Sequence, residues 1–185
     1  MVFNSQAQYF AKLMHNCAQI KEKIPLVFGV PDALFFEEFK EKKVFVAELR
    51  PGLEGMKIVS KEFLKIGVVP VIICDNMMAF CMQRGLVEAV HIFSSGADKG
   101  KGSCRTGSLI AALCASLHNI PVYMHPVRNP HKSLLNVSNG VHASQNKGSK
   151  GFDLTKIGND SVTIPGIRTY APLLEEVPLS LVKTS

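Results

Sequence analysis

The sequence predicts an α/β fold in which helices cover both faces of a mainly parallel β-sheet. Five short runs rich in Val and Ile lack the polar alternation of half-exposed strands, so we expect them to be buried on both faces. Amphipathic segments of helix length separate these runs. Strands and helices that alternate at this spacing indicate right-handed crossovers and a parallel sheet.

The predicted elements follow one another in a regular order. An amphipathic helix comes first, within residues 1–23, because apolar side chains recur on one of its faces: Phe10, Leu13, Met14, Cys17 and Ile20. The expected strands are 24–30, 42–49, 69–75, 87–95 and 120–126. The expected helical segments between them are 32–42, 55–67, 76–85 and 106–119.

Length and composition are consistent with one domain over residues 1–185. The chain has 185 residues, of which 46% are apolar, and this is enough for one sizeable core. Residues 128–160 are polar and rich in Asn, Ser, Gly and Lys, so they predict a long loop or an added flap. Hydrophobic residues return in 161–185, where we expect a C-terminal strand and a docked tail.

The net charge of the chain leaves two interpretations open. A formal charge of +6 and a pI of about 9.1 fit either a solvated basic surface or an anionic partner such as a sugar phosphate, a nucleotide or RNA. Aromatic residues make up 8% of the chain, and they are not interleaved with basic runs in the way that nucleic-acid platforms require. A nucleic-acid partner is therefore the least expected of the anions.

Cysteine usage and the N-terminus indicate a reducing compartment. The five cysteines form an odd set without a C-x-x-C pair or zinc-ligand spacing, so no metal site and no bound cofactor are predicted. The first residues are polar throughout, unlike a signal peptide, and no apolar run reaches the roughly 20 residues that span a bilayer. We expect a soluble, cytoplasmic protein without membrane contact.

The segment "SSGADKGKGSCRTGS", residues 94–108, is the candidate binding loop. Ligands of open parallel sheets lie outside the carboxyl ends of the strands, and this segment follows the fourth predicted strand. Its glycines allow close backbone approach, and "RTGS" offers N–H groups at a helix start, where the helix dipole favours an anion. The pattern matches neither a Walker loop nor a dinucleotide fingerprint. Pattern alone leaves an ordinary Gly-rich turn and a phosphate cradle as equal alternatives.

Two candidates near the strand ends, Asp75 and Arg50, have two interpretations each, and Cys104 and Arg105 are further candidates there. Asp75 either caps the helix that follows it or touches a ligand. Arg50 either pairs with an acidic side chain or binds the anion. Cys104, near a helix start and beside the basic Arg105, is a candidate for a lowered thiol pKa, while Arg105 itself can bind two phosphate oxygens at once.

Histidines and methionines complete the set of candidates. His91 lies in a strand run and is expected in the core, whereas His125 follows a strand end and is placed to reach the site. Met77, Met78 and Met82 recur at helical spacing, and we expect them to serve a core or to lie exposed at a dimer interface.

Four stretches, taken together, resemble one protein family. They are "ELRPGLEGMKIV", "VPVIICDNMMAFCMQRGLVEAVHIFSSGAD", "RTGSLIAALCASLHNIPVYM" and "PLLEEVPLSLV". In this order they resemble the regulatory alpha, beta and delta subunits of eukaryotic initiation factor 2B and the isomerases of methylthioribose 1-phosphate and ribose 1,5-bisphosphate. The resemblance covers roughly Ile24 to Val182. It implies a Rossmann-like domain, pairing of two copies through this domain, and a preceding helical domain that this sequence lacks.

The resemblance also implies residue roles. In the isomerases, the aspartate of the G-A-D motif works with a cysteine after the first strand to move protons, and the matching aspartate is Asp98. The cysteine has no match, because "PLVFGVPDALF" places Gly29, Val30 and Pro31 there. Loss of that partner predicts lost or altered catalysis. Glu54 stands where the isomerases often have glutamine, and its charge would repel a phosphate.

The candidate site residues fall into two groups. Asp98 and Cys104 are the candidate catalytic residues. The candidate ligand-binding residues are Arg50, Asp75, Asn76, Gly96, Lys99, Arg105, Thr106, Gly107 and Ser108. An anion is expected between Gly96 and Ser108, on Arg105 and the backbone N–H groups of Thr106 and Gly107.

Three functions remain open at this point. The first is a homodimer that binds a small phosphorylated sugar or nucleotide, with catalysis lost or altered. The second is an active aldose–ketose isomerase that uses Asp98 with another partner, such as Cys104, Cys74 or His125. The third is a protein-interaction subunit without a ligand.

Overall fold

The computed structural model of the chain describes residues 21–127, 154–162, 164 and 166–183. The predicted N-terminal helix and most of the predicted polar loop, 128–160, lie outside these ranges. No helix in the described ranges is long and apolar enough to cross a membrane.

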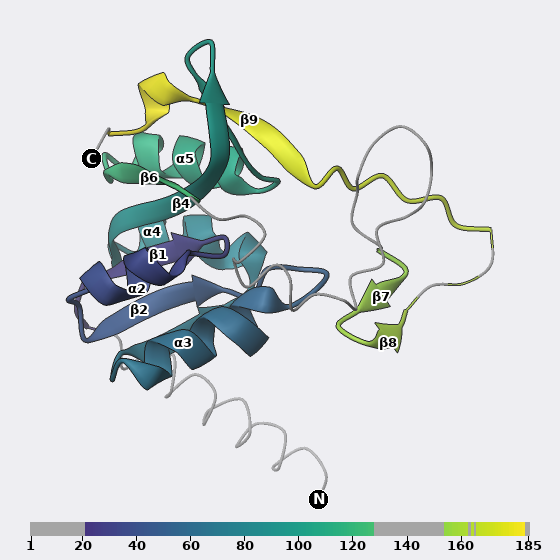
Figure 1. The fold of residues 1–185 in the computed structure, drawn as a ribbon, viewed down its shortest axis with the longest axis horizontal. Coiled ribbons are helices and arrows are strands. Elements are labelled where there is room, and N and C mark those ends of the chain that lie inside the picture. The colour runs from purple at the N-terminus through teal and green to yellow at the C-terminus, as the bar shows by residue number, and fades with distance from the viewer. Residues whose placement is uncertain (1–20, 128–153, 163, 165, 184–185) are drawn as a thin grey trace, which may run out of the picture.

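Five parallel strands form the centre of the sheet, as predicted (Figure 1). They are β1 (Ile24–Phe28), β2 (Lys43–Ala47), β3 (Val69–Ile73), β4 (Val87–Asp98) and β6 (Val122–Pro126). Their order across the sheet is β3-β2-β1-β4, with β6 on the other side of β4. The chain therefore starts in the middle of the sheet, builds outward in one direction, and then returns to build in the other.

Helices lie on both faces of this sheet, which confirms the predicted fold class. One face carries α2 (Ala33–Glu38) and α3 (Ser60–Lys65), whose Phe36 and Phe63 rings lie 5.0 Å apart. A π-helical turn, η1 (Gly55–Val59), leads into α3. The opposite face carries α4 (Met78–Gln83), which follows the 3-10 turn η2 (Asp75–Met77), and α5 (Ser108–Leu117); these two helices lie side by side (Figure 1). After β3 the chain crosses back to place β4 on the other side of β1. Right-handed crossovers in the two directions put the two pairs of helices on opposite faces.

The segment expected to be a binding loop forms a β-hairpin instead. Strand β4 continues to Asp98, and β5 (Lys101–Arg105) returns antiparallel beside it. Lys99 and Gly100 form the turn, both with positive φ, as a two-residue hairpin turn requires. The expectation of a loop was wrong because the lack of apolar alternation in this segment hid two strands that extend beyond the buried sheet.

The C-terminal region adds a further strand. β9 (Leu174–Pro178) pairs antiparallel with β5, and the turn η4 (Leu179–Leu181) follows it. Lys183 then forms a single parallel bridge with Tyr123 at the edge of β6. Before β9, the strands β7 (Lys156–Ile157) and β8 (Asp160–Ser161) form a small separate hairpin.

The core lies between the sheet and its helices. All five residues of β1 are buried, as are the last four of β2, which fits strands covered on both faces. Met78 and Met82 are also buried, at 4% and 2% exposure, so of the two alternatives from the sequence the structure adopts the core and not exposure at an interface. Both methionines fill the space between α4 and the sheet.

Gly55 fixes the position of η1 against β2. A side chain at this glycine would place its Cβ 1.8 Å from the carbonyl oxygen of Ala47. Only glycine permits this approach, and it holds the loop of residues 48–54 over the carboxyl end of β2.

Candidate functional site

The candidate site lies at the carboxyl ends of β1, β2 and β4. The strand order reverses between β1 and β4, and open α/β sheets bind ligands at such a point. Three parts of the chain meet here: the loop of residues 48–54, Asp75 shortly after β3, and Arg105 at the end of β5.

Asp75 holds the loop from the side of β3. Its two carboxylate oxygens accept hydrogen bonds from the backbone N–H groups of Leu49, at 2.8 Å, and Arg50, at 2.7 Å. The helical turn that contains Asp75 has no side-chain capping bond, so the interpretation of Asp75 as a cap was wrong. Leu49 has a φ of 60°, a conformation that bulky residues rarely adopt, and Asp75 stabilises it.

Arg105 holds the same loop from the side of β5. Its Nη2 donates to the carbonyl oxygens of Leu49, at 3.2 Å, and Arg50, at 3.1 Å, and to the Glu54 carboxylate, at 3.2 Å. The side chains of Arg105 and Glu54 are only 10% and 4% exposed. Burial lowers the pKa of Arg105, while the negative charge of Glu54 opposes that shift. Glu54 is thus the counter-ion of a buried arginine.

Arg50 points away from this buried pair. Its Nε donates to a carboxylate oxygen of Glu48 at 2.8 Å, and this bond raises the pKa of Arg50. Pairing with an acidic side chain, one of the two interpretations from the sequence, is the one that the structure adopts.

The N-terminus of α5 is bound by a carboxylate of the chain itself. One oxygen of Glu175, on β9, accepts hydrogen bonds from the backbone N–H groups of Gly107, at 2.7 Å, and Leu109, at 2.8 Å. The Thr106 N–H donates to the carbonyl oxygen of Leu173 at 3.1 Å. The expectation that Thr106 and Gly107 offer their N–H groups to an external anion was therefore wrong, because Leu173, just before β9, and Glu175, in β9, accept these two bonds.

Glu175 is the residue of this region that the sequence reasoning missed. It lies 68 residues from Gly107 along the chain, and no local pattern links the two positions. Ser108, next to Gly107, is fully buried, and its hydroxyl has no hydrogen-bond partner within the described part of the chain. Ser108 therefore belongs to the packing under α5 and does not line the surface of the site.

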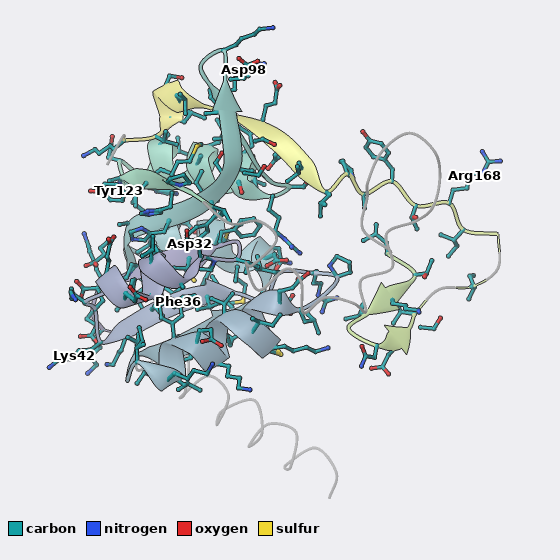
Figure 2. The ribbon with its side chains drawn as sticks, viewed as in Figure 1. Asp32, Phe36, Lys42, Asp98, Tyr123 and Arg168 are labelled. Carbon is teal, nitrogen blue, oxygen red and sulfur yellow. The ribbon has the colours of Figure 1, made fainter. Side chains whose placement is uncertain are left out.

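Asp98 lies far from Arg105. In the hairpin, Asp98 is opposite Lys101, whereas Ser94 is opposite Cys104, next to Arg105. Four residues of strand separate the two levels, which is roughly 13 Å. Figure 2 shows Asp98 at the tip of the hairpin, away from the sheet. The structure thus places Asp98 and the nearby Lys99 outside the group formed by Arg105, Glu54 and Asp75.

Two other predicted residues also lie apart from that group. Gly96 is exposed on the hairpin, and Asn76 is exposed in η2. They are candidates by sequence position only, whereas Arg105 donates hydrogen bonds to Leu49, Arg50 and Glu54.

Cys104 is not an activated thiol. It is fully buried, and burial raises its pKa to about 11, the opposite of the predicted lowering. The prediction failed because Cys104 is in β5, one residue before Arg105, and its side chain faces the core rather than the start of α5. At physiological pH the thiol is neutral.

A small cavity of about 100 Å³ opens beside these groups. It lies at the carboxyl ends of β1 and β4 and against β5 and the start of β9. Its lining residues include Gly29, Val30, Phe93, Ser95, Ser103 and Arg105. The cavity therefore combines Arg105 and two serines with a wall that is mostly apolar.

Sequence comparison connects the chain with known proteins. The sequence profile described as the initiation factor 2 subunit family matches residues 12–183. The chain is 29% identical over 152 residues to the methylthioribose-1-phosphate isomerase of Trichormus variabilis, and this match covers 80% of this chain and 42% of that protein. It is 31% identical over 148 residues to the isomerase of the same name from Carboxydothermus hydrogenoformans, covering 77% of this chain and 41% of that one. The chain thus spans about two fifths of the length of these curated relatives.

Solved structures share the fold. The initiation factor eIF-2B delta subunit of A. fulgidus superposes with a TM-score of 0.65 at 19% identity, covering 89% of this chain and 52% of that one. The 5-methylthioribose 1-phosphate isomerase of Pyrococcus horikoshii gives a TM-score of 0.64 at 16% identity, covering 91% and 51%.

The buried pair of Arg105 and Glu54 predicts a specific pattern of stability. Arg105→Met leaves the Glu54 charge buried without its partner, so we expect the free energy of unfolding to fall by about 3 kcal/mol. The double variant Arg105→Met/Glu54→Leu removes both charges and should recover more than half of that loss. Urea unfolding measures both values. A double variant no more stable than Arg105→Met would show that Arg105 acts through the Leu49 and Arg50 carbonyl groups alone.

Proposed function

Because the chain belongs to the initiation factor 2 subunit family, we propose that it binds a small phosphorylated sugar or nucleotide at the carboxyl ends of its strands, without the isomerase chemistry of its relatives. The observation that carries this proposal is that Arg105, a buried cation, lines a cavity at the point where the strand order reverses. A phosphoryl group is the part of such a ligand that an arginine and nearby hydroxyl groups recognise.

The lining of the cavity supports binding by this end of the ligand. Ser95 and Ser103 contribute hydroxyl groups beside Arg105. A cavity of about 100 Å³ has room for the phosphoryl group, and the sugar would lie at its mouth. Leu173 and Leu174 close one side of the cavity, so the sugar would extend out of it between the hairpin and the loop after β1.

The positions of the acid–base candidates support the loss of catalysis. Proton transfer needs groups within hydrogen-bond distance of the substrate. Asp98 is at the hairpin tip, Cys104 is buried with a raised pKa, and the turn after β1 has Gly29 and Val30 in place of a cysteine. None of these three positions supplies a base beside the cavity.

Ligand binding is tested by calorimetry with ribose 5-phosphate and AMP, and with ribose as the unphosphorylated control. We expect the phosphorylated compounds to bind and ribose not to bind. Arg105→Lys keeps the charge but loses the planar donor pair, so the affinity of this variant for the phosphorylated compounds should fall at least tenfold. The same change also loosens the loop. Asp98→Asn is the matched control and should stay within twofold of the native protein. If neither phosphorylated compound binds, the proposed site is wrong.

Loss of catalysis is tested with methylthioribose 1-phosphate as substrate, followed by ³¹P and ¹H NMR. We expect no ketose product above the uncatalysed rate, because none of those three positions supplies a base beside the cavity. The isomerase of Carboxydothermus hydrogenoformans, assayed in parallel, is the positive control. Product formation that Asp98→Asn abolishes would instead support the alternative of an active isomerase.

We further propose that two copies of the chain pair through α4 and α5. Four large apolar side chains on the outer surface of these helices are between 49% and 79% exposed: Phe80, Ile110, Leu113 and Leu117. On α5 they recur at intervals of three and four residues, as on a helix face that packs against a neighbour. An exposed apolar surface of this kind is typical of an interface between proteins.

Sedimentation equilibrium tests the pairing. We expect a dimer at micromolar concentration for the native chain. Leu113→Glu places a charge in the middle of the proposed interface and should give a monomer, because an unpaired charge buried there is costly. Leu64→Glu, at a residue 60% exposed on the opposite face of the sheet, is the matched control and should remain dimeric. A monomeric native chain, or equal effects of both variants, would contradict the proposed interface.

A further inference from the structure

A second, larger cavity lies on the face of the sheet that carries α2. Its volume is about 410 Å³, and it lies between α2 on one side and the strands β4 and β6 on the other. It is formed by the surface of the sheet and not by the strand ends, so it is separate from the candidate site described above. A site in this cavity would not depend on the function proposed there.

Five rings form the wall and floor of this cavity: Phe35, Phe39, His91, Tyr123 and His125. The His91 ring stacks on Tyr123 on one side, with centroids 5.5 Å apart, and on His125 on the other, at 5.1 Å. The Phe35 ring stands edge-on to His125 at 4.9 Å. The rings are thus packed against one another and hold a fixed aromatic surface.

The two imidazoles of this surface are neutral at physiological pH. The Nδ1 of His91 lies 2.9 Å from the Nε2 of His125, a hydrogen bond in which one ring donates to the other. Burial, with a smaller effect of the neighbouring His125, lowers the pKa of His91 to about 4. Burial also lowers the pKa of His125. The histidines therefore add no positive charge to the cavity.

Carboxylates line the rim above the rings. Glu38, Glu41 and Glu88 line the cavity, and none of them forms an ion pair within the described part of the chain. Burial and the negative charge of Glu41 both raise the pKa of Glu88. The one basic residue of the rim, Lys40, donates to the carbonyl oxygen of Glu37 at 3.4 Å. The chain as a whole has a net charge of +6, so this cavity is a local region of opposite sign.

We propose that this cavity binds an organic cation, a guanidinium or ammonium group, over its ring surface and between its carboxylates. Aromatic faces attract cations through their quadrupole, and carboxylates pair with them directly. A cation between Glu41 and Glu88 also relieves the repulsion of two like charges. The same chemistry is offered by a free organic amine or guanidine and by a Lys or Arg side chain of a protein partner.

The test uses two probes of equal shape and different charge. Nα-acetyl-arginine amide carries the guanidinium, and Nα-acetyl-citrulline amide replaces it with a neutral urea. Binding is followed through the ring C–H signals of His91 and His125 in ¹H–¹³C NMR spectra of the whole chain. We expect saturable shifts with the arginine probe, at least tenfold weaker binding of the citrulline probe, and loss of affinity as salt is added. Equal binding of both probes, or no saturable shift, overturns the proposal.

Variants of the rim identify the groups that bind. Glu41→Gln/Glu88→Gln removes both charges and should weaken the arginine probe at least tenfold. Glu37→Gln, an exposed position of α2 that does not line the cavity, is the matched control and should stay within twofold. Unchanged binding to the double variant, or an equal loss in the control, overturns the proposal. The melting temperatures of the native protein and both variants are measured and should agree, which excludes unfolding as the cause of weaker binding.

Two further probes distinguish the source of the cation. Butylguanidinium represents a free organic cation, and the peptide acetyl-Gly-Arg-Gly-amide represents a protein side chain. Tighter binding of the peptide supports a partner protein, and tighter binding of butylguanidinium supports a metabolite. Failure of both probes overturns the proposal.

Discussion

The Arg105 guanidinium holds the loop after β2, and the geometry of the strand ends depends on that contact. The loop would otherwise present two inward-facing carbonyl groups and the buried Glu54 carboxylate with no positive charge near them. Buried groups of this kind are costly unless they are paired. Asp75 completes the arrangement by accepting the two backbone N–H groups of the same loop. The positive Arg105 thus binds the carbonyl groups of this loop, and the negative Asp75 binds its N–H groups.

The start of α5 shows a second case in which the chain satisfies its own polar groups. The free N–H groups of a helix N-terminus are suited to an anion, and Glu175 supplies one from β9. The carboxylate occupies the position that a phosphate takes in many nucleotide-binding proteins. The strand ends therefore hold their shape without a ligand. The N–H groups of Gly107 and Leu109 therefore already have an acceptor within the chain.

The sequence predicted the central sheet because its strands carry strong local signals. Runs such as residues 24–28 and 69–73 are apolar throughout, which favours strands of a parallel sheet. Strand β1 is buried over its whole length, whereas β3, at the edge of the sheet, is only partly buried. Residues 95–101 of the β4–β5 hairpin are all exposed and lack large apolar side chains, so this part of the sequence resembles a loop. The predicted role of Cys104 depended on that loop and failed with it.

Contacts between distant residues lay beyond sequence reasoning for a different reason. Glu175 with Gly107, Arg105 with Leu49, and His91 with His125 each join segments that are far apart along the chain. No periodicity or spacing encodes such pairs, since they follow from the order of the strands. The sequence placed Arg105 and Asp75 near the strand ends, where the structure has them, but it did not predict which groups they contact.

The pairing of β5 with β9 has a consequence for how the chain folds. Within the parallel core, β1 pairs with β2, β2 with β3 and β4 with β6 over short distances along the chain, but Leu26 of β1 meets Val90 of β4 across 64 residues, close to the 68 residues between Gly107 and Glu175. Bringing the ends of so long a segment together costs conformational entropy before any contact repays it. Both pairings therefore carry a similar cost of loop closure, but β1 lies between β2 and β4, whereas β9 pairs with β5 alone in the described part of the chain. The same strand is the least costly part to detach, which gives this edge of the sheet a lower local stability than its centre.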